Sequence, residues 1–367
     1  MKWLDYIVRY FVGGLFIFSG LVKLNDPRGT EIKMEEYFEV FSTDFAHFFE
    51  YLIPFAMLIG MLLIIFEIVF GVAVLLSFKM KWTLWALGLL IIFFTFLTFY
   101  SAYFDKVTDC GCFGDAIPLT PWQSFSKDIM FIVLISYLLW RMDNFKAWLS
   151  DKMNIIILSA STILSIYLGI YAINHLPFID FRPYAVGDNI PANMVAPEQP
   201  EFVYTFEKDG EELSSAKYLV AEEGYTYIGH KITNQENTIP KITDYNIWND
   251  ELGDYTSQSF IGLKLFMVIY DARTAEASKM EEIAQLIHDL GEEVEPIILT
   301  ASMGEDMQYF LLEHNLNIPF FFGDATVLKA MIRSSPGIML LNNGTVLVKW
   351  HINDTPDINE VYNLIQN

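Results

Sequence analysis

Long apolar stretches dominate the first half of the chain. Five of them, of roughly twenty residues each, lie between residues 1 and 176. An apolar helix of about twenty residues crosses roughly 30 Å of hydrocarbon, so each stretch predicts a transmembrane helix. The first four are expected to form a bundle and the fifth to tether the second half of the chain. The predicted helices span residues 4–24, 55–78, 83–104, 125–140 and 154–176.

The pattern changes after residue 176, where short strands and amphipathic helices replace the long apolar stretches. Residues 177–238 begin as a linker rich in Pro, Asn and Asp and continue as a small β-rich segment with a hairpin turn at Asp209-Gly210. Residues 239–367 alternate strands with helices and then turn sharply at Asn343-Gly344. The predicted class is therefore an α-helical membrane bundle followed by an α/β domain. That domain is expected to contain strands at 263–270, 294–299, 337–341 and 345–350 and helices at 276–290, 303–314, 325–332 and 357–366.

Charge divides at the same place along the chain. Of its residues 53% are hydrophobic and its net charge is −22, and the part from Pro177 onward carries 11 Lys and Arg against 30 Asp and Glu. Nucleic acids and anionic lipid headgroups select clusters of Lys and Arg. The composition therefore argues against a nucleic-acid-binding function.

Basic residues in the short loops predict the orientation. Cytoplasmic loops carry an excess of Lys and Arg, so the N-terminus is expected in the cytoplasm. Five crossings of the inner membrane then place the loop 105–124 and the domain after residue 176 in the periplasm. The first helix lacks a cleavage site of the Ala-x-Ala type and is expected to be retained. The basic residues on the predicted cytoplasmic side are Lys2, Lys79, Lys81, Arg141, Lys146 and Lys152.

The chain has two cysteines, Cys110 and Cys112, separated by Gly111 in the outer loop. They can pair with each other, bind something together or engage another protein. One intervening residue holds the two Cα atoms near the upper end of the distance that a disulfide tolerates. Such a ring is expected to be strained and comparatively oxidising, and Gly111 supplies the backbone freedom that it needs. A redox pair is one interpretation, and a static staple or two inert thiols is the other. No metal is expected, because the loop offers Asp but no His beside the thiols.

Glu67 lies midway through the second predicted helix. A charge at that depth costs about 3 kcal/mol on insertion scales. The carboxyl is therefore expected to face the bundle, either neutral or paired with Arg9 or Lys23 of the first helix. A proton or ligand site and a structural polar contact are equal alternatives for this residue. No cofactor is certain, and a quinone between the aromatic-rich helices stays open.

Two motifs of the membrane half resemble known families. Residues 18–24, Phe-Ser-Gly-Leu-Val-Lys-Leu, with Ser19, Gly20 and Lys23, resemble DoxX-type membrane proteins. The loop Cys110-Gly111-Cys112-Phe113-Gly114 resembles the methylamine-utilisation MauE proteins. The resemblance covers about residues 1–145 and implies a small helical bundle that assists disulfide formation or maturation of exported proteins. It implies that Cys110 and Cys112 are the redox pair. Nothing shows that methylamine is involved, and the fused domain, similar to chains from Bacteroidetes bacteria, suggests a different client.

Residues 239–367 resemble the thioredoxin fold in the order of their elements, with a lead-in at 239–245 similar to peroxiredoxin-like members. Where active members carry Cys-x-x-Cys, this chain reads Asp271-Ala272-Arg273-Thr274. The domain is therefore expected to be inactive in exchange and retained for binding. Pro336 stands where the fold usually keeps a cis proline. Membrane disulfide enzymes of the vitamin-K-epoxide-reductase kind use two cysteine pairs, so the one pair here cannot complete such a relay.

Two functions from different classes are consistent with these features. The first is a membrane thiol–disulfide helper in the lipid bilayer, whose pair exchanges with a periplasmic partner or an exported client while the acidic domain docks that protein. Whether such a helper is itself an enzyme stays open. The second is a non-enzymatic scaffold or accessory subunit of an envelope complex. Transport is the weakest alternative, because one buried carboxylate and no broken-helix pattern provide little of a pathway.

Overall fold

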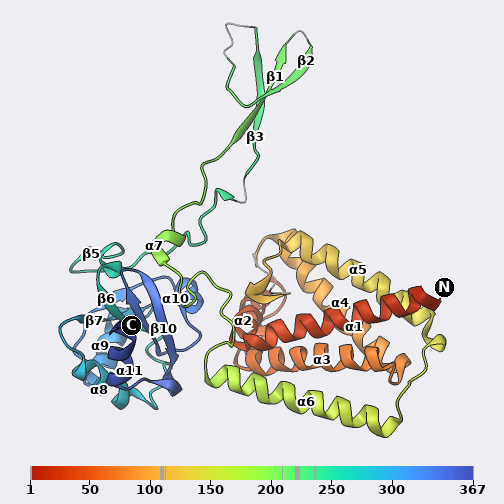
Figure 1. Ribbon diagram of the computed structural model, residues 1–367, viewed down its shortest axis with the longest axis horizontal. Coiled ribbons are helices and arrows are strands. Elements are labelled where there is room, and N and C mark those ends of the chain that lie inside the picture. The colour runs from red at the N-terminus through yellow and green to blue at the C-terminus, as the bar shows by residue number, and fades with distance from the viewer. Residues whose placement is uncertain are drawn as a thin grey trace. The chain divides into compact units, whose positions relative to one another are not determined.

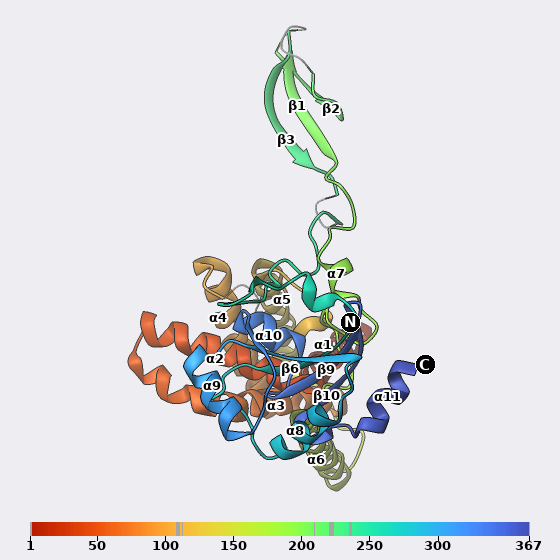
Figure 2. The same cartoon turned by 90° about the vertical axis from the view of Figure 1, so that its left-hand side faces the viewer.

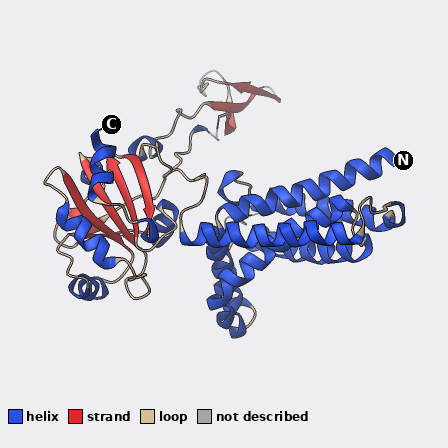
Figure 3. Ribbon diagram, turned by 60° about the horizontal axis from the view of Figure 1, so that its bottom comes forward, coloured by secondary structure: helices blue, strands red, loops and turns tan. Residues whose placement is uncertain are grey.

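The computed structural model describes residues 2–107, 111, 113–208, 210–219, 224–234 and 237–366. The chain divides into two compact units, residues 1–182 and 183–367 (Figure 1). Figure 3 shows that the first unit is built from helices and that the second contains the strands. The predicted class, a bundle of apolar helices followed by an α/β domain, is confirmed.

Long helices make up the first unit. Among the described residues, four helices have the length and composition to cross a membrane: 3–25, 47–76, 80–104 and 151–174. The predicted span at 125–140 is not among the four, because its helix begins with the polar segment 121–128. The elements are α1 (Lys2–Asn25), α2 (Pro27–Asp44), the 3₁₀ helix η1 (His47–Phe55), α3 (Ala56–Leu76), α4 (Met80–Phe104), η2 (Gly114–Ala116), α5 (Pro121–Trp140), η3 (Met142–Asn144) and α6 (Asp151–Asn174).

Polar caps explain why two helices begin a few residues before their apolar stretches. The Thr120 side chain accepts a hydrogen bond from the Gln123 backbone N–H, the Gln123 side chain accepts one from the Thr120 backbone, and Pro121 occupies the first turn of α5. This reciprocal pattern satisfies N–H groups that have no partner inside the helix. Ser150 caps α6 through the backbone N–H of Met153. The apolar pattern alone therefore marks the spans but not the capped first turns.

Helices α1 and α3 approach each other closely. A Cβ built on Gly71 of α3 would lie 2.9 Å from the carbonyl oxygen of Gly13 in α1, and one built on Gly20 would lie 2.5 Å from the Ile68 side chain. Small residues permit such close backbone contact between membrane helices. These glycines fix which residues of the two helices lie side by side.

Helix α2 is amphipathic and packs its apolar face into the first unit. Its buried residues include Met34, Tyr37, Phe38 and Phe41, the aromatic and apolar positions of the segment between the first two spans. The Tyr37 hydroxyl lies 2.7 Å from the Ser101 hydroxyl of α4. This packing brings α2 beside the end of α4 from which the cysteine loop departs.

The second unit contains a seven-stranded sheet with the order β10-β9-β6-β7-β8-β4-β5. Strands β6, β7 and β8 pair in parallel, and β9 runs antiparallel to both β6 and β10, so the order is that of the thioredoxin-like fold. Its elements are β4 (Trp248–Asn249), β5 (Gly253–Asp254), η6 (Gln258–Phe260), β6 (Leu263–Ile269), α8 (Met280–Asp289), β7 (Val294–Thr300), α9 (Gly304–Glu313), β8 (Phe320–Phe322), α10 (Ala325–Met331), β9 (Gly337–Asn342), β10 (Thr345–His351), η7 (Ile352–Asp354) and α11 (Ile358–Gln366).

Residues expected to form a linker are partly integrated into this unit. The Gly187 backbone N–H donates to the carbonyl of Val346 at 2.8 Å, and that of Ile190 donates to Gly344 at 2.9 Å. The segment around α7 (Ile190–Asn193) therefore packs on the β9–β10 hairpin. The three-stranded sheet comes next in the chain, with β1 between β2 and β3 (Figure 2). Its strands are β1 (Phe202–Lys208), β2 (Glu211–Ser215) and β3 (Thr226–Ile232).

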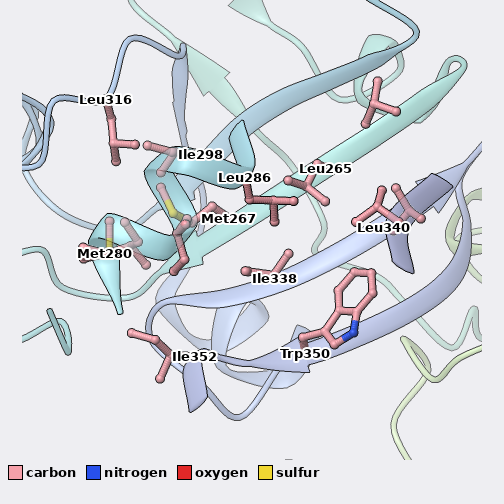
Figure 4. Close-up of a cluster of buried hydrophobic side chains, with 14 of the residues drawn as sticks. Leu265, Met267, Met280, Leu286, Ile298, Leu316, Ile338, Leu340, Trp350 and Ile352 are labelled. Atoms are coloured by element: carbon pink, nitrogen blue, oxygen red, sulfur yellow. The ribbon is translucent and has the colours of Figure 1, made fainter. Parts of the chain in front are cut away.

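A buried apolar cluster joins α8, α9 and α11 to the large sheet (Figure 4). Leu340 on β9 and Leu265 and Met267 on β6 lie at its centre, at most 2% exposed. Each has apolar neighbours from the sheet and from a helix. The burial of these apolar side chains stabilises the packing of the three helices on the sheet.

We expect Leu340→Ala to lower the free energy of unfolding of the second unit by about 2–5 kcal/mol, because it removes a fully buried side chain and leaves a cavity. The matched control is Leu312→Ala on α9, where the side chain is 76% exposed and the expected change is within about 0.5 kcal/mol. Urea unfolding of the full chain in mild detergent measures both. Equal midpoints for the two variants would contradict the assigned core.

Candidate functional site

The two cysteines, Cys110 and Cys112, lie outside the described residues, but their neighbours Gly111, Phe113 and Gly114 are described. Gly111 has a φ of +60°, in the region that favours glycine. A Cβ on Gly111 would touch the Lys33 side chain of α2 at 3.4 Å, and one on Gly114 would touch Val22 of α1 at 3.5 Å. The residues around the motif thus pack against α1 and α2.

The chain leading into the motif is tied to α2. Asp44, at the end of α2, forms an ion pair with Lys106 and accepts a hydrogen bond from the Tyr100 hydroxyl. The Lys106 ammonium and then the Tyr100 hydroxyl lower the pKa of Asp44 below its ordinary value. Asp44 therefore stays ionised at neutral pH, and the ion pair anchors the α4 end of the cysteine loop.

A buried ion pair lies between α1 and α3. Lys23 forms an ion pair with Glu67, which is only 1% exposed. The Lys23 ammonium also lies 4.6 Å from the centre of the Phe94 ring. The second carboxylate oxygen of Glu67, Oε2, has no hydrogen-bond partner among the described residues. Burying an acceptor that has no hydrogen-bond partner lowers the stability of the fold. The burial of Oε2 therefore needs a structural or functional reason.

Glu67 lines a small cavity inside the bundle. The polar side chains around this cavity are Ser19, Lys23, Glu67 and Lys127, and phenylalanine rings form much of the remaining wall. One of these rings belongs to Phe113, the residue that follows Cys112 in the sequence. The cavity therefore reaches from the buried ion pair to the neighbourhood of the cysteine motif.

A second charged pair lies on α5. The Lys127 ammonium lies 2.9 Å from Oδ1 of Asp128 and 5.0 Å from the centre of the Phe113 ring. The Thr98 hydroxyl of α4 donates to Oδ2 of Asp128 at 3.0 Å. The sequence analysis did not identify this pair. The signal was available, because Lys127 and Asp128 are charged residues within a predicted membrane helix, as Glu67 is.

Arg9 does not reach the cavity. Its guanidinium donates a hydrogen bond to the Ser77 hydroxyl at the end of α3 and lies 4.7 Å from the centre of the Tyr10 ring. Of the two cations on α1 that were candidates for Glu67, the structure thus brings only Lys23 to it. Arg9 contributes to packing at the other end of these helices.

The thioredoxin-like unit has an ordered loop at the position where active members carry cysteines. The Tyr270 backbone N–H donates to the Ser335 hydroxyl at 3.0 Å, and Ala272 donates to the Ser302 hydroxyl at 2.7 Å. The Ser335–Pro336 peptide bond is cis. Arg273, 2.8 Å from Asp271, lowers the pKa of that carboxyl. Polar side chains hold this loop, and its sequence contains no thiol.

Comparisons with known proteins agree with the resemblance of the membrane half. Residues 1–141 match the family described as methylamine utilisation protein MauE. The chain is also similar to Protein TlpB from Flavobacterium psychrophilum, with 28% identity over 175 residues, which cover 46% of this chain and 44% of that protein. The match thus spans less than half the length of that relative. No solved structure matches the chain.

Proposed function

We propose that the protein is a thiol–disulfide helper of the inner membrane, in which Cys110 and Cys112 exchange with a periplasmic partner or an exported client. The observation that carries this proposal is that all the thiols of the chain stand in one Cys-Gly-Cys motif. The residues around this motif pack on the bundle that matches MauE. In this proposal the chain crosses the membrane five times, because α5, which packs beside α4 through Thr98 and Asp128, is added to the four helices that have the length and composition of membrane spans.

The chemical step is thiol–disulfide exchange. A thiolate of the partner attacks one sulfur of the Cys110–Cys112 disulfide, which gives a mixed disulfide and one free thiolate. The second thiolate of the partner then attacks the partner's own sulfur in the mixed disulfide. This forms the partner's disulfide and releases the other cysteine of the pair as a thiolate. The partner loses two electrons and two protons and becomes a disulfide, and the pair becomes two thiols. The cysteine-free second unit docks the protein that is being oxidised.

The first test is alkylation in intact cells with a membrane-impermeant maleimide, with and without mild reduction, measured as a shift on a gel. We expect modification of Cys110 and Cys112 only after reduction, because the pair faces outward as a labile disulfide. The control is the Cys110→Ser/Cys112→Ser chain, which cannot shift. Thiols that react without reductant, or a bond that resists it, would contradict the proposal.

A second candidate is a scaffold of an envelope complex. The observation that favours it is the loop at Asp271–Arg273, which contains no thiol and in which Arg273 donates hydrogen bonds to the Asp271 carboxylate. In this candidate function the loop binds a partner without exchanging disulfides. This candidate predicts stoichiometric co-purification with a stable partner that persists in the Cys110→Ser/Cys112→Ser chain. Loss of the partner in that variant would favour the helper instead.

A further inference from the structure

We propose that the bundle binds the headgroup of an anionic phospholipid at the end where α3 turns into α4. This inference goes beyond the proposed function and does not involve the cysteines. Three observations carry it. Arg9 is buried without a carboxylate partner among the described residues, exposed lysines lie in the adjacent turn, and exposed tryptophans follow at the start of α4.

Arg9 is a buried cation on α1. It is 4% exposed, its guanidinium donates to the Ser77 hydroxyl, and its Nε has no hydrogen-bond partner in the described part of the chain. Asp5, the only acid of α1, is held instead by Arg141, with 3.0 Å between Nη2 and Oδ2, and by the Tyr137 hydroxyl at 2.6 Å. Burying a charge without an opposite charge lowers the stability of the fold. An anion that reaches Arg9 would therefore stabilise the bundle.

The turn that Arg9 contacts carries an excess of positive charge. Ser77 ends α3 and Lys79 precedes α4. Lys79 and Lys81 are exposed, and neither forms an ion pair within the described ranges. The first N–H groups of α4 have no partner inside the helix and form the positive end of its dipole. The link between α5 and α6, whose Phe145 ring lies 5.8 Å from the Arg9 guanidinium, adds no excess charge. Its exposed charged residues balance one another: Asp143, Lys146, Asp151 and Lys152.

The position of this turn favours a lipid headgroup over a soluble anion. Helices α3 and α4 both have the length and composition to cross a membrane, so the short turn between them lies at the membrane surface. Trp82 and Trp85, at the start of α4, are 74% and 55% exposed. Tryptophan side chains are enriched at the headgroup level of membranes. A lipid bound at the turn can lay its acyl chains along the exposed apolar side chains of α4.

A phosphodiester headgroup with a net negative charge meets these requirements. Arginine binds phosphate oxygens through parallel N–H donors, and lysines add point charges. A zwitterionic headgroup is less suitable, because Lys79 and Lys81 repel its ammonium group. The Tyr6 and Tyr10 rings lie over the Arg9 guanidinium, with their centres 5.2 and 4.7 Å from its carbon, and both residues are about half exposed. A rotation of these side chains therefore opens the guanidinium to the lipid.

The experiment measures lipid binding by the full chain in mild detergent. The chain is stripped of lipid and titrated with an equal mixture of phosphatidylglycerol and phosphatidylcholine that have the same acyl chains, and native mass spectrometry counts the lipids retained. We expect about a tenfold preference for phosphatidylglycerol, which Lys79→Gln/Lys81→Gln should lower about fivefold, because each lysine adds to the attraction of an anionic headgroup. Inorganic phosphate should leave the preference unchanged, since it has no acyl chains.

The matched control is Lys208→Gln/Lys217→Gln, at the end of β1 and after β2. It changes the net charge by the same amount and should keep the preference. Equal losses in the two double variants would overturn the site, because net charge alone would then attract the lipid. Displacement of the lipid by inorganic phosphate would overturn the assignment to a lipid, and a parent chain without any preference would overturn the proposal as a whole.

Arg9→Met tests the buried cation separately by thermal unfolding in the same detergent. With phosphatidylcholine it should unfold at or above the temperature of the parent chain, because the substitution removes a buried charge that has no ion pair. Phosphatidylglycerol should raise the midpoint of the parent chain by about 2–4 °C and leave that of Arg9→Met unchanged. An equal rise in both chains would contradict the assignment of Arg9 to the site.

Discussion

Each single variant, Cys110→Ser or Cys112→Ser, should accumulate a mixed disulfide with the partner, whereas the double variant should form none. The reason is that exchange passes through a mixed disulfide, which the second cysteine of the pair normally resolves. One cysteine alone can still pair with a partner thiol but cannot release it. Non-reducing gels of cells quenched with acid and alkylated detect the trapped species as a larger band that reductant removes.

The double variant should also lower disulfide formation in the client to the level found when the whole chain is deleted. Serine is close to cysteine in size, so the loop and its anchor at Asp44 and Lys106 should persist. A double variant that supports the same level of client disulfides as the natural chain would refute the exchange function. A trapped band that remains in the double variant would show that the cross-link comes from elsewhere.

Much of the fold is predictable from pattern. Apolar length predicted the four helices of the described residues that are long and apolar enough to cross a membrane. The Asn343-Gly344 turn predicted the β9–β10 hairpin, which is confirmed with Asn342 opposite Thr345. Strand β8 was missed because three residues, Phe320–Phe322, are too few for a periodicity to show. The packing of Gly187 and Ile190 on the hairpin was missed because backbone hydrogen bonds made by a loop leave no mark in the sequence.

The candidate site was predictable only in part. The position of Glu67 in the middle of an apolar helix identified it as a candidate from the sequence. Its partner could not be identified in the same way, because that depends on how α1 and α3 are aligned along each other. Arg9 and Lys23 lie about 21 Å apart along α1, given a rise of 1.5 Å per residue, so one carboxylate cannot serve both. Apolar helices carry no pattern that sets this register, and the close contact of Gly13 with Gly71 does so in the structure.

Changing Lys23 to Met alone should destabilise the bundle by about 3–5 kcal/mol, because the Glu67 carboxylate would stay buried with no cation beside it. Changing both residues, Lys23→Met and Glu67→Met, should recover most of that loss, since apolar side chains often replace a buried ion pair without cost. Thermal unfolding in mild detergent, read as the fraction that stays monodisperse, measures the two variants side by side.

The matched control for this pair is Arg28→Met, which removes the cation from a partly exposed ion pair with Glu31 at 3.0 Å. Exposed pairs contribute about 0–1 kcal/mol, so the control should unfold almost as the natural chain does. If Lys23→Met were no worse than this control, the carboxylate would not depend on Lys23. If the double variant were as unstable as Lys23→Met, the pair would stabilise the bundle in its own right, and Glu67 would be part of the architecture as well as of the cavity.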